Sequence, residues 1–175
     1  PMALTHHGSK KISYFRNFIF GVEDGLVSTV AFLAGISVAS VPKEILFLSG
    51  IVLIFVEAFS MAAGAFLSEE STEEYEGKVE RTTPYFTAAI MFVSYFLAGL
   101  IPLLPYVFFT PMLAFGSSIL LSLLALFVLG VVSGELTRMN VTKSALRMVF
   151  VGGLAIGVGL IVSTLVQNNF LNGLV

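Results

Sequence analysis

Three carboxylate side chains lie inside segments of this chain that are apolar enough to cross a lipid bilayer. They are Glu23, Asp24 and Glu57. A charged carboxylate at membrane depth costs roughly 2.5–3.5 kcal/mol on insertion scales, so such a residue marks a functional site by default. No Lys or Arg lies deep in any candidate span to pair with them. We therefore expect a proton, a metal cation, or each in turn to neutralise these groups, which indicates cation transport.

A methionine lies one helical turn from one of these acids. Glu57 and Met61 are four residues apart, so a helix places them on the same face. Carboxylates alone suit Mg²⁺ or Ca²⁺, whereas an added thioether favours a first-row transition metal. We expect Asp24, Glu57 and Met61 to be metal ligands. The alternatives are a hydrogen bond to a neighbouring helix for Asp24 and simple packing for Met61.

Glu23 and Asp24 point in different directions from the first helix. On a helix, adjacent residues diverge by about 100°, so Glu23 and Asp24 cannot face one narrow path equally well. We keep Glu23 as a candidate metal ligand, with a structural role as the alternative.

The composition is that of an integral membrane protein. Of the 175 residues, 57% are hydrophobic and only 11% are charged, against about 25% in soluble domains. The absence of cysteine excludes disulfides and thiolate metal sites. We take Pro1 as a cloning remnant before a natural start at Met2. We see no nucleotide fingerprint, no nucleophile–base constellation and no nucleic-acid surface.

The predicted fold is all-α, with five transmembrane helices that each approach the ~20 residues needed to cross the hydrocarbon core. The predicted spans are about 14–38, 45–68, 85–104, 111–134 and 145–167. A polar leader at 1–13 precedes them, and a short acidic segment at 69–83 separates the second from the third. Three prolines, Pro102, Pro105 and Pro111, predict a short, partly embedded turn after the third span.

Basic residues predict the orientation. With the N-terminus in the cytoplasm, eight of the nine Lys and Arg residues fall on or near the cytoplasmic face, and only Lys43 falls outside. This asymmetry follows the positive-inside rule. An odd number of spans then places the C-terminus on the far side of the membrane.

Glycine pairs at spacing four predict where helices pack. Gly21 and Gly25 flank the two acids of the first span, and Gly153 and Gly157 lie in the fifth. Small residues at this spacing let membrane helices approach closely.

The acidic segment offers a second place for metal. Spacings of three and four would gather its carboxylates on adjoining faces of a helical extension, where they could capture cations or raise their concentration at the mouth of a path. The alternative is a solvated charged loop. The candidates are Glu70, Glu73, Glu74, Glu76 and Glu80.

Two sequence runs resemble a known family. They are Phe20-Gly21 with Asp24-Gly25-Leu26-Val27-Ser28-Thr29, and Ser60-Met61-Ala62-Ala63-Gly64. Similar features follow at Leu100–Pro105 and Gly152–Gly157. Together they resemble the vacuolar iron transporter family of Fe²⁺ and Mn²⁺ carriers.

The resemblance implies a homodimer with a metal path along the interface, lined by the first two helices. Asp24 and Met61 match the family's pathway ligands. It also implies a secondary transporter rather than an enzyme, which exports Fe²⁺ or Mn²⁺ from the cytosol in exchange for protons and holds no permanent cofactor. We expect a prokaryotic cytoplasmic membrane, or a vacuolar membrane if the source is eukaryotic.

The chain departs from the family pattern in two places. Many relatives carry a Glu after the glycine of the Ser-Met motif, where this chain has Ala65, and Glu57 is a candidate replacement. The long Glu-rich cytoplasmic insertion of some members is reduced here to the short acidic segment. Two other functions stay open: a metal-binding sensor or scaffold subunit without transport, and a membrane-embedded carboxylate enzyme.

Overall fold

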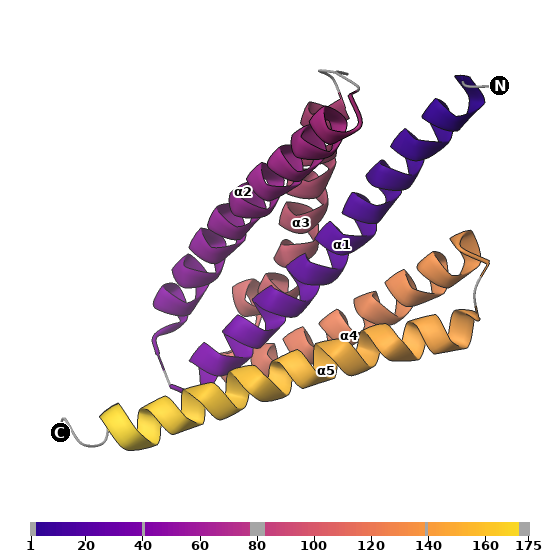
Figure 1. Ribbon diagram of the computed structural model, residues 1–175. Helices are drawn as coiled ribbons and strands as arrows, with labels where there is room; N and C mark the ends of the chain where they lie inside the picture. The colour runs from indigo at the N-terminus through magenta and orange to yellow at the C-terminus, as the bar shows by residue number, and fades with distance from the viewer. Residues whose placement is uncertain (1–2, 40, 78–82, 139, 172–175) are drawn as a thin grey trace.

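The predicted fold class is confirmed. A computed structural model describes residues 3–39, 41–77, 83–138 and 140–171, and in these ranges the regular structure is entirely helical (Figure 1). Five of the helices are long and apolar enough to cross a membrane. They are α1 (Ala3–Val38), α2 (Lys43–Tyr75), α3 (Thr83–Phe108), α4 (Pro111–Leu136) and α5 (Val141–Val166), and a π-helical turn, η1 (Gln167–Leu171), continues α5.

Helix α1 is the common neighbour in this arrangement. It packs most extensively against α3 and also along α5, whereas α2 rests mainly on α3 and touches α1 far less. Helices α4 and α5 form an antiparallel pair that meets the other three near the C-terminal end of α1 and diverges from them toward the opposite end (Figure 1).

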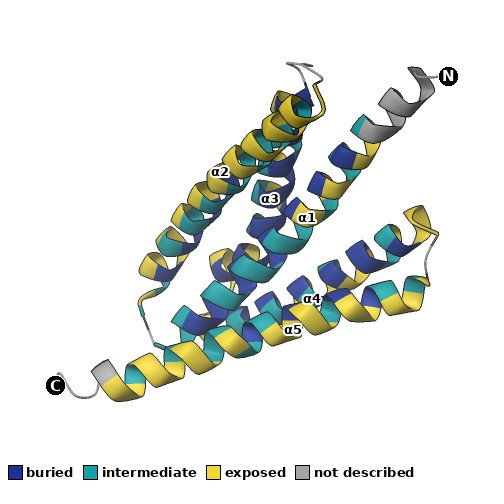
Figure 2. Cartoon of the chain, in the orientation of Figure 1, coloured by how far each residue is buried: buried dark blue, intermediate teal, exposed yellow. Residues whose placement is uncertain are grey.

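The burial pattern suits a protein surrounded by lipid. Buried positions follow the lines where helices meet, and the outward faces are exposed (Figure 2). Those exposed faces carry large apolar side chains, among them Phe59, Phe108 and Met112. In water such a surface would drive aggregation, but in hydrocarbon it carries no penalty. The core where α1 to α4 meet consists of Leu33, Leu46, Ile54, Leu103, Tyr106 and Ala114.

Helix α3 is longer than predicted. The turn expected from Pro102 onward is wrong, because the helix runs through Pro102 and Pro105 to Phe108. Proline removes a backbone hydrogen bond, yet membrane helices tolerate it where neighbouring groups satisfy the backbone. The prolines leave the carbonyls of Ala98 and Ile101 without their usual helical donors. In the same stretch the Ser118 hydroxyl of α4 donates to the Pro102 carbonyl at 2.7 Å and links the two helices. Only two residues then connect α3 to α4.

Two other helix boundaries also differ from the prediction. Helix α1 already begins at Ala3, so most of the expected leader is a helical extension. Helix α2 continues to Tyr75, so the first part of the acidic segment prolongs a membrane helix. Polar residues do not end a helix when they leave the bilayer, since its backbone bonds are internal. Glu80 lies outside the described residues.

The fifth helix packs through glycines other than the predicted pair. A Cβ added at Gly153 or Gly157 would meet nothing within 4 Å in this chain, so the expected packing role there is wrong for the protomer. A Cβ at Gly152 would instead overlap Leu126 of α4, and one at Gly159 would overlap the Ala31 carbonyl of α1. The glycine spacing did not reveal which side of α5 faces its neighbours.

Candidate functional site

The middle of α1 lies directly against α3 because it carries glycine there. A Cβ at Gly21 would overlap the Ser94 hydroxyl, and one at Gly25 would lie 2.5 Å from the Tyr95 carbonyl oxygen. Neither position has room for a side chain, which explains the small-residue pair that the sequence shows. This close approach fixes the height and rotation of the α1 segment that bears Asp24.

The fold brings two of the predicted carboxylates together from different helices. Asp24 of α1 and Glu57 of α2 are each half-buried, and the charge of Glu57 acts on Asp24, with a smaller effect from Glu23. No Lys or Arg within the described ranges forms a salt bridge to Asp24 or Glu57. Like charges that influence each other in a medium of low dielectric constant repel, so a cation or proton bound between them would stabilise the pair.

A buried tyrosine completes the surroundings of this pair. Tyr95 of α3 is fully buried, its hydroxyl is hydrogen-bonded to Ser28 of α1, and the charges of Asp24 and Glu57 both act on it. Sequence reasoning missed Tyr95. The available signal was a phenol inside an apolar span, because a buried hydroxyl requires a partner.

Met61 faces a separate, polar cavity of about 280 Å³ between α1, α2 and α3. Glu57 does not line it, so the predicted pairing of Glu57 and Met61 in one ligand set is not present there. The cavity does contain a second thioether, Met91, which the sequence gave no reason to select. Its lining is Arg16, Asn17, Phe20, Ser60, Met61, Gly64, Ala65, Ser68, Glu69 and Met91.

One carboxylate reaches this cavity, and it belongs to Glu69. The Ser13 hydroxyl donates to it at 2.7 Å, and the Asn17 amide donates to the Ser13 carbonyl at 2.9 Å. Ala65 lines the same cavity one helical turn earlier. Glu69 therefore brings a carboxylate to the cavity that Ala65 lines, whereas Glu57 does not line it, and a replacement of the missing carboxylate by Glu57 stays a prediction.

The remaining predicted acids that the structure describes form no complete site. Glu70, Glu73 and Glu74 lie on the C-terminal extension of α2, and Glu76 directly follows it. In the part of the chain that is described, no three His, Asp or Glu side chains are grouped closely enough to hold a metal ion. Among the described residues, one protomer offers the Asp24–Glu57 pair and, separately, one carboxylate with two thioethers around the cavity.

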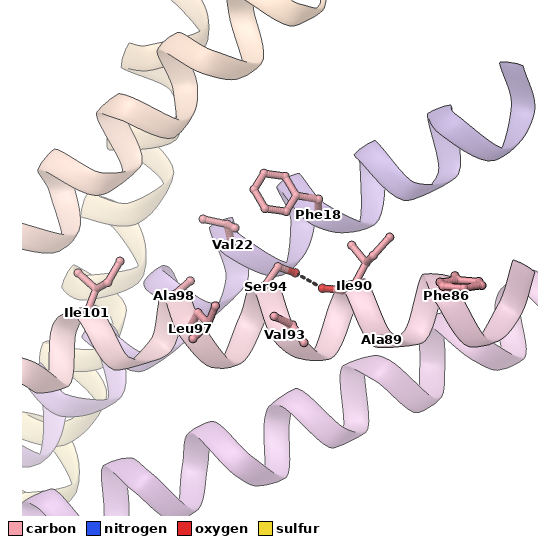
Figure 3. Close-up of a pocket in the computed structure, with 10 residues that line it drawn as sticks. All are labelled: Phe18, Val22, Phe86, Ala89, Ile90, Val93, Ser94, Leu97, Ala98 and Ile101. Atoms are coloured by element: carbon pink, nitrogen blue, oxygen red, sulfur yellow. Dashed lines mark hydrogen bonds between the residues drawn. The ribbon is translucent and has the colours of Figure 1, made fainter.

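A second, larger groove is lined by side chains that do not bind cations. It is an apolar groove of about 520 Å³ on the outer side of α1 and α3 (Figure 3). The one hydroxyl among its lining side chains, that of Ser94, turns back and donates to the Ile90 carbonyl of its own helix (Figure 3). This groove therefore offers no side chain that could hold an ion, unlike the polar cavity and the Asp24–Glu57 pair.

Comparison with known proteins agrees with this picture. A model of the VIT family matches residues 15–82 and 73–164, which together cover most of the chain. The chain belongs to the VIT family. Two similar proteins come from Arabidopsis thaliana. Vacuolar iron transporter homolog 3 is 29% identical over 86% of this chain and 82% of its own length. Vacuolar iron transporter 1 is 25% identical over 94% of this chain and 92% of its own length. Vacuolar iron transporter 1 of Tulipa gesneriana is 26% identical over 80% of this chain and 82% of its own length.

The two VIT matches meet at the acidic connection. They overlap at residues 73–82, which is where a longer segment between the second and third spans would interrupt the match. The alignment with Arabidopsis vacuolar iron transporter 1 extends over 233 positions, more than the 175 residues of this chain, so that relative carries residues absent here. As a VIT protein, this chain is a short form.

Proposed function

We propose that this VIT protein is a secondary transporter that exports Fe²⁺ or Mn²⁺ from the cytosol in exchange for protons. The observation that carries the proposal is the Asp24–Glu57 pair, two carboxylates from different membrane helices without a basic partner among the described residues. Such a pair can bind a divalent cation or protons, and alternation between them couples the two fluxes. The relatives named vacuolar iron transporters support the choice of iron.

The polar cavity is the proposed cytoplasmic entry to this path. It lies beside the N-terminal half of α1 and the C-terminal half of α2, the ends that the positive-inside rule assigns to the cytoplasm. Met61, Met91 and Glu69 offer two soft donors and one hard donor, a set that suits a first-row transition metal better than Mg²⁺ or Ca²⁺. The metal is the cargo, and we propose no permanently bound cofactor.

We further propose that the transporter works as a homodimer. The described residues of one chain bring too few acidic ligands together to complete a site, and α1 and α2 make little contact along their length. A two-fold axis beside α1 and α2 would place two copies of the Asp24–Glu57 pair at one interface and supply the missing ligands. The membrane would be the prokaryotic cytoplasmic membrane, or the vacuolar membrane in a eukaryote.

The test is metal uptake into liposomes that contain only this protein. We expect Fe²⁺ and Mn²⁺ uptake that depends on the pH gradient, and loss of at least nine-tenths of it in Asp24→Asn. Glu44→Gln is the matched control, because it removes an exposed carboxylate at the start of α2. Metal binding by the wild type without any uptake would refute transport and favour the sensor.

A further inference from the structure

Two tyrosines of α3 form the same hydrogen bond to two serines of α1. Tyr95 bonds to Ser28 at 2.5 Å, and Tyr106 bonds to Ser37 at 2.9 Å. Both tyrosines are almost completely buried, with exposed fractions of 0% and 1%. The chain thus contains two chemically equivalent pairs at different depths, and only one lies beside the carboxylates.

The direction of both bonds follows from counting protons. The Ser28 hydroxyl donates its single proton to the Asp24 carbonyl at 2.6 Å, and the Ser37 hydroxyl donates to the Leu33 carbonyl at 2.7 Å. A hydroxyl has one proton to give, so each serine oxygen acts as an acceptor toward its tyrosine. Tyr95 therefore donates its proton to Ser28, and that proton is not available to another acceptor.

The two pairs differ in what surrounds them. One helical turn before Ser28, on the same face of α1, lies the acidic residue Asp24, whereas the apolar residue Leu33 takes the equivalent place before Ser37. A phenol beside a carboxylate in an apolar medium would normally donate to it, because a charge-assisted bond is stronger than a neutral one. The bond to Ser28 prevents this at Tyr95.

We infer that Ser28 is a positioning residue that keeps the Tyr95 proton away from the Asp24–Glu57 pair. The carboxylates then retain their lone pairs for the transported cation. The inference rests on the proposed transport function and assigns Ser28 and Tyr95 a part in the affinity for metal.

The inference predicts an unusual pattern among substitutions. In Ser28→Ala the tyrosine loses its acceptor and donates to a carboxylate instead, which competes with the metal. We expect the metal concentration for half-maximal uptake to rise about tenfold, with little change in maximal rate. The double variant Ser28→Ala/Tyr95→Phe also lacks the phenol proton, so its half-maximal metal concentration should return to within about threefold of the wild-type value.

The matched control is Ser37→Ala, which breaks the equivalent bond to Tyr106 away from the acids and should leave the half-maximal concentration within about twofold of wild type. Tyr95→Phe alone is an independent test, because it needs no change at Ser28. It should leave metal affinity unchanged or higher, whereas a ligand or proton-relay role for the hydroxyl would lower affinity or flux.

Uptake of Fe²⁺ and Mn²⁺ by liposomes is measured for all four variants and the wild type, after size-exclusion chromatography shows that each is folded. An effect of Ser28→Ala equal to that of Ser37→Ala overturns the inference. The inference is also overturned if the double variant needs as high a metal concentration for half-maximal uptake as Ser28→Ala does. It is likewise overturned if Tyr95→Phe binds metal more weakly than the wild type. Absence of uptake by the wild type would instead refute the transport function.

Discussion

Gly25 gives the sharpest test of how α1 is held against α3. A Cβ at this position would lie 2.5 Å from the Tyr95 carbonyl oxygen and 3.1 Å from its Cα. An ordinary carbon–oxygen contact is about 3.4 Å, so Gly25→Ala requires the two backbones to separate by roughly 0.9 Å. Both partners are main chain and cannot rotate away. Overpacking of this kind costs about 1–3 kcal/mol.

Gly25 is the immediate neighbour of Asp24, so we expect its displacement to lower both the rate of transport and the thermal stability. We expect Gly25→Ala to unfold at a lower temperature in detergent and to take up metal at least fivefold more slowly in liposomes. Gly153→Ala is the matched control, because a Cβ there meets nothing within 4 Å in this chain, and both properties should stay near wild type. A Gly25→Ala protein as stable and as active as Gly153→Ala would refute the packing argument.

Three other predictions follow from the cavity and from α3. Glu69→Gln should raise the metal concentration for half-maximal uptake several-fold, whereas Glu74→Gln, on the extension of α2 and outside the cavity, should change it less than twofold. Met61→Leu should lower uptake of Fe²⁺ more than that of Mn²⁺ in a competition assay, because loss of a thioether harms the softer ion more; equal losses would argue against sulfur ligation. Ser118→Ala should reduce thermal stability by about 1 kcal/mol without altering metal affinity, since it removes only the donor to the Pro102 carbonyl.

Much of the fold could be predicted from hydropathy, because apolar runs of about 20 residues have few alternatives to a membrane helix. The ends of the helices could not. The prolines of α3 predicted a turn, since the sequence does not show that the helix packs closely enough on its neighbours to continue through them. The second span was predicted to end near residue 68, although the helix continues to Tyr75 through part of the acidic segment.

The faces of the helices were harder to predict than their positions. In a soluble protein the buried side of a helix is the apolar side, but in a bilayer both sides are apolar and the periodic signal is lost. That is why the fifth helix was expected to pack through Gly153 and Gly157, although Gly152 and Gly159 make the close approaches.

The sequence by itself determined the class of protein and the number of spans. It also selected Asp24 and Glu57 as candidate site residues, because a carboxylate inside an apolar run is conspicuous without any knowledge of its neighbours. Only the tertiary structure decided which groups share a space with them. Tyr95 of α3 bonds to the face of α1 that carries Asp24, and Met91 of α3 lines the same cavity as Met61 of α2. The relative rotation of α1 and α3 is set by the backbone contacts between them. Those contacts join residues about seventy positions apart, and no local pattern encodes them.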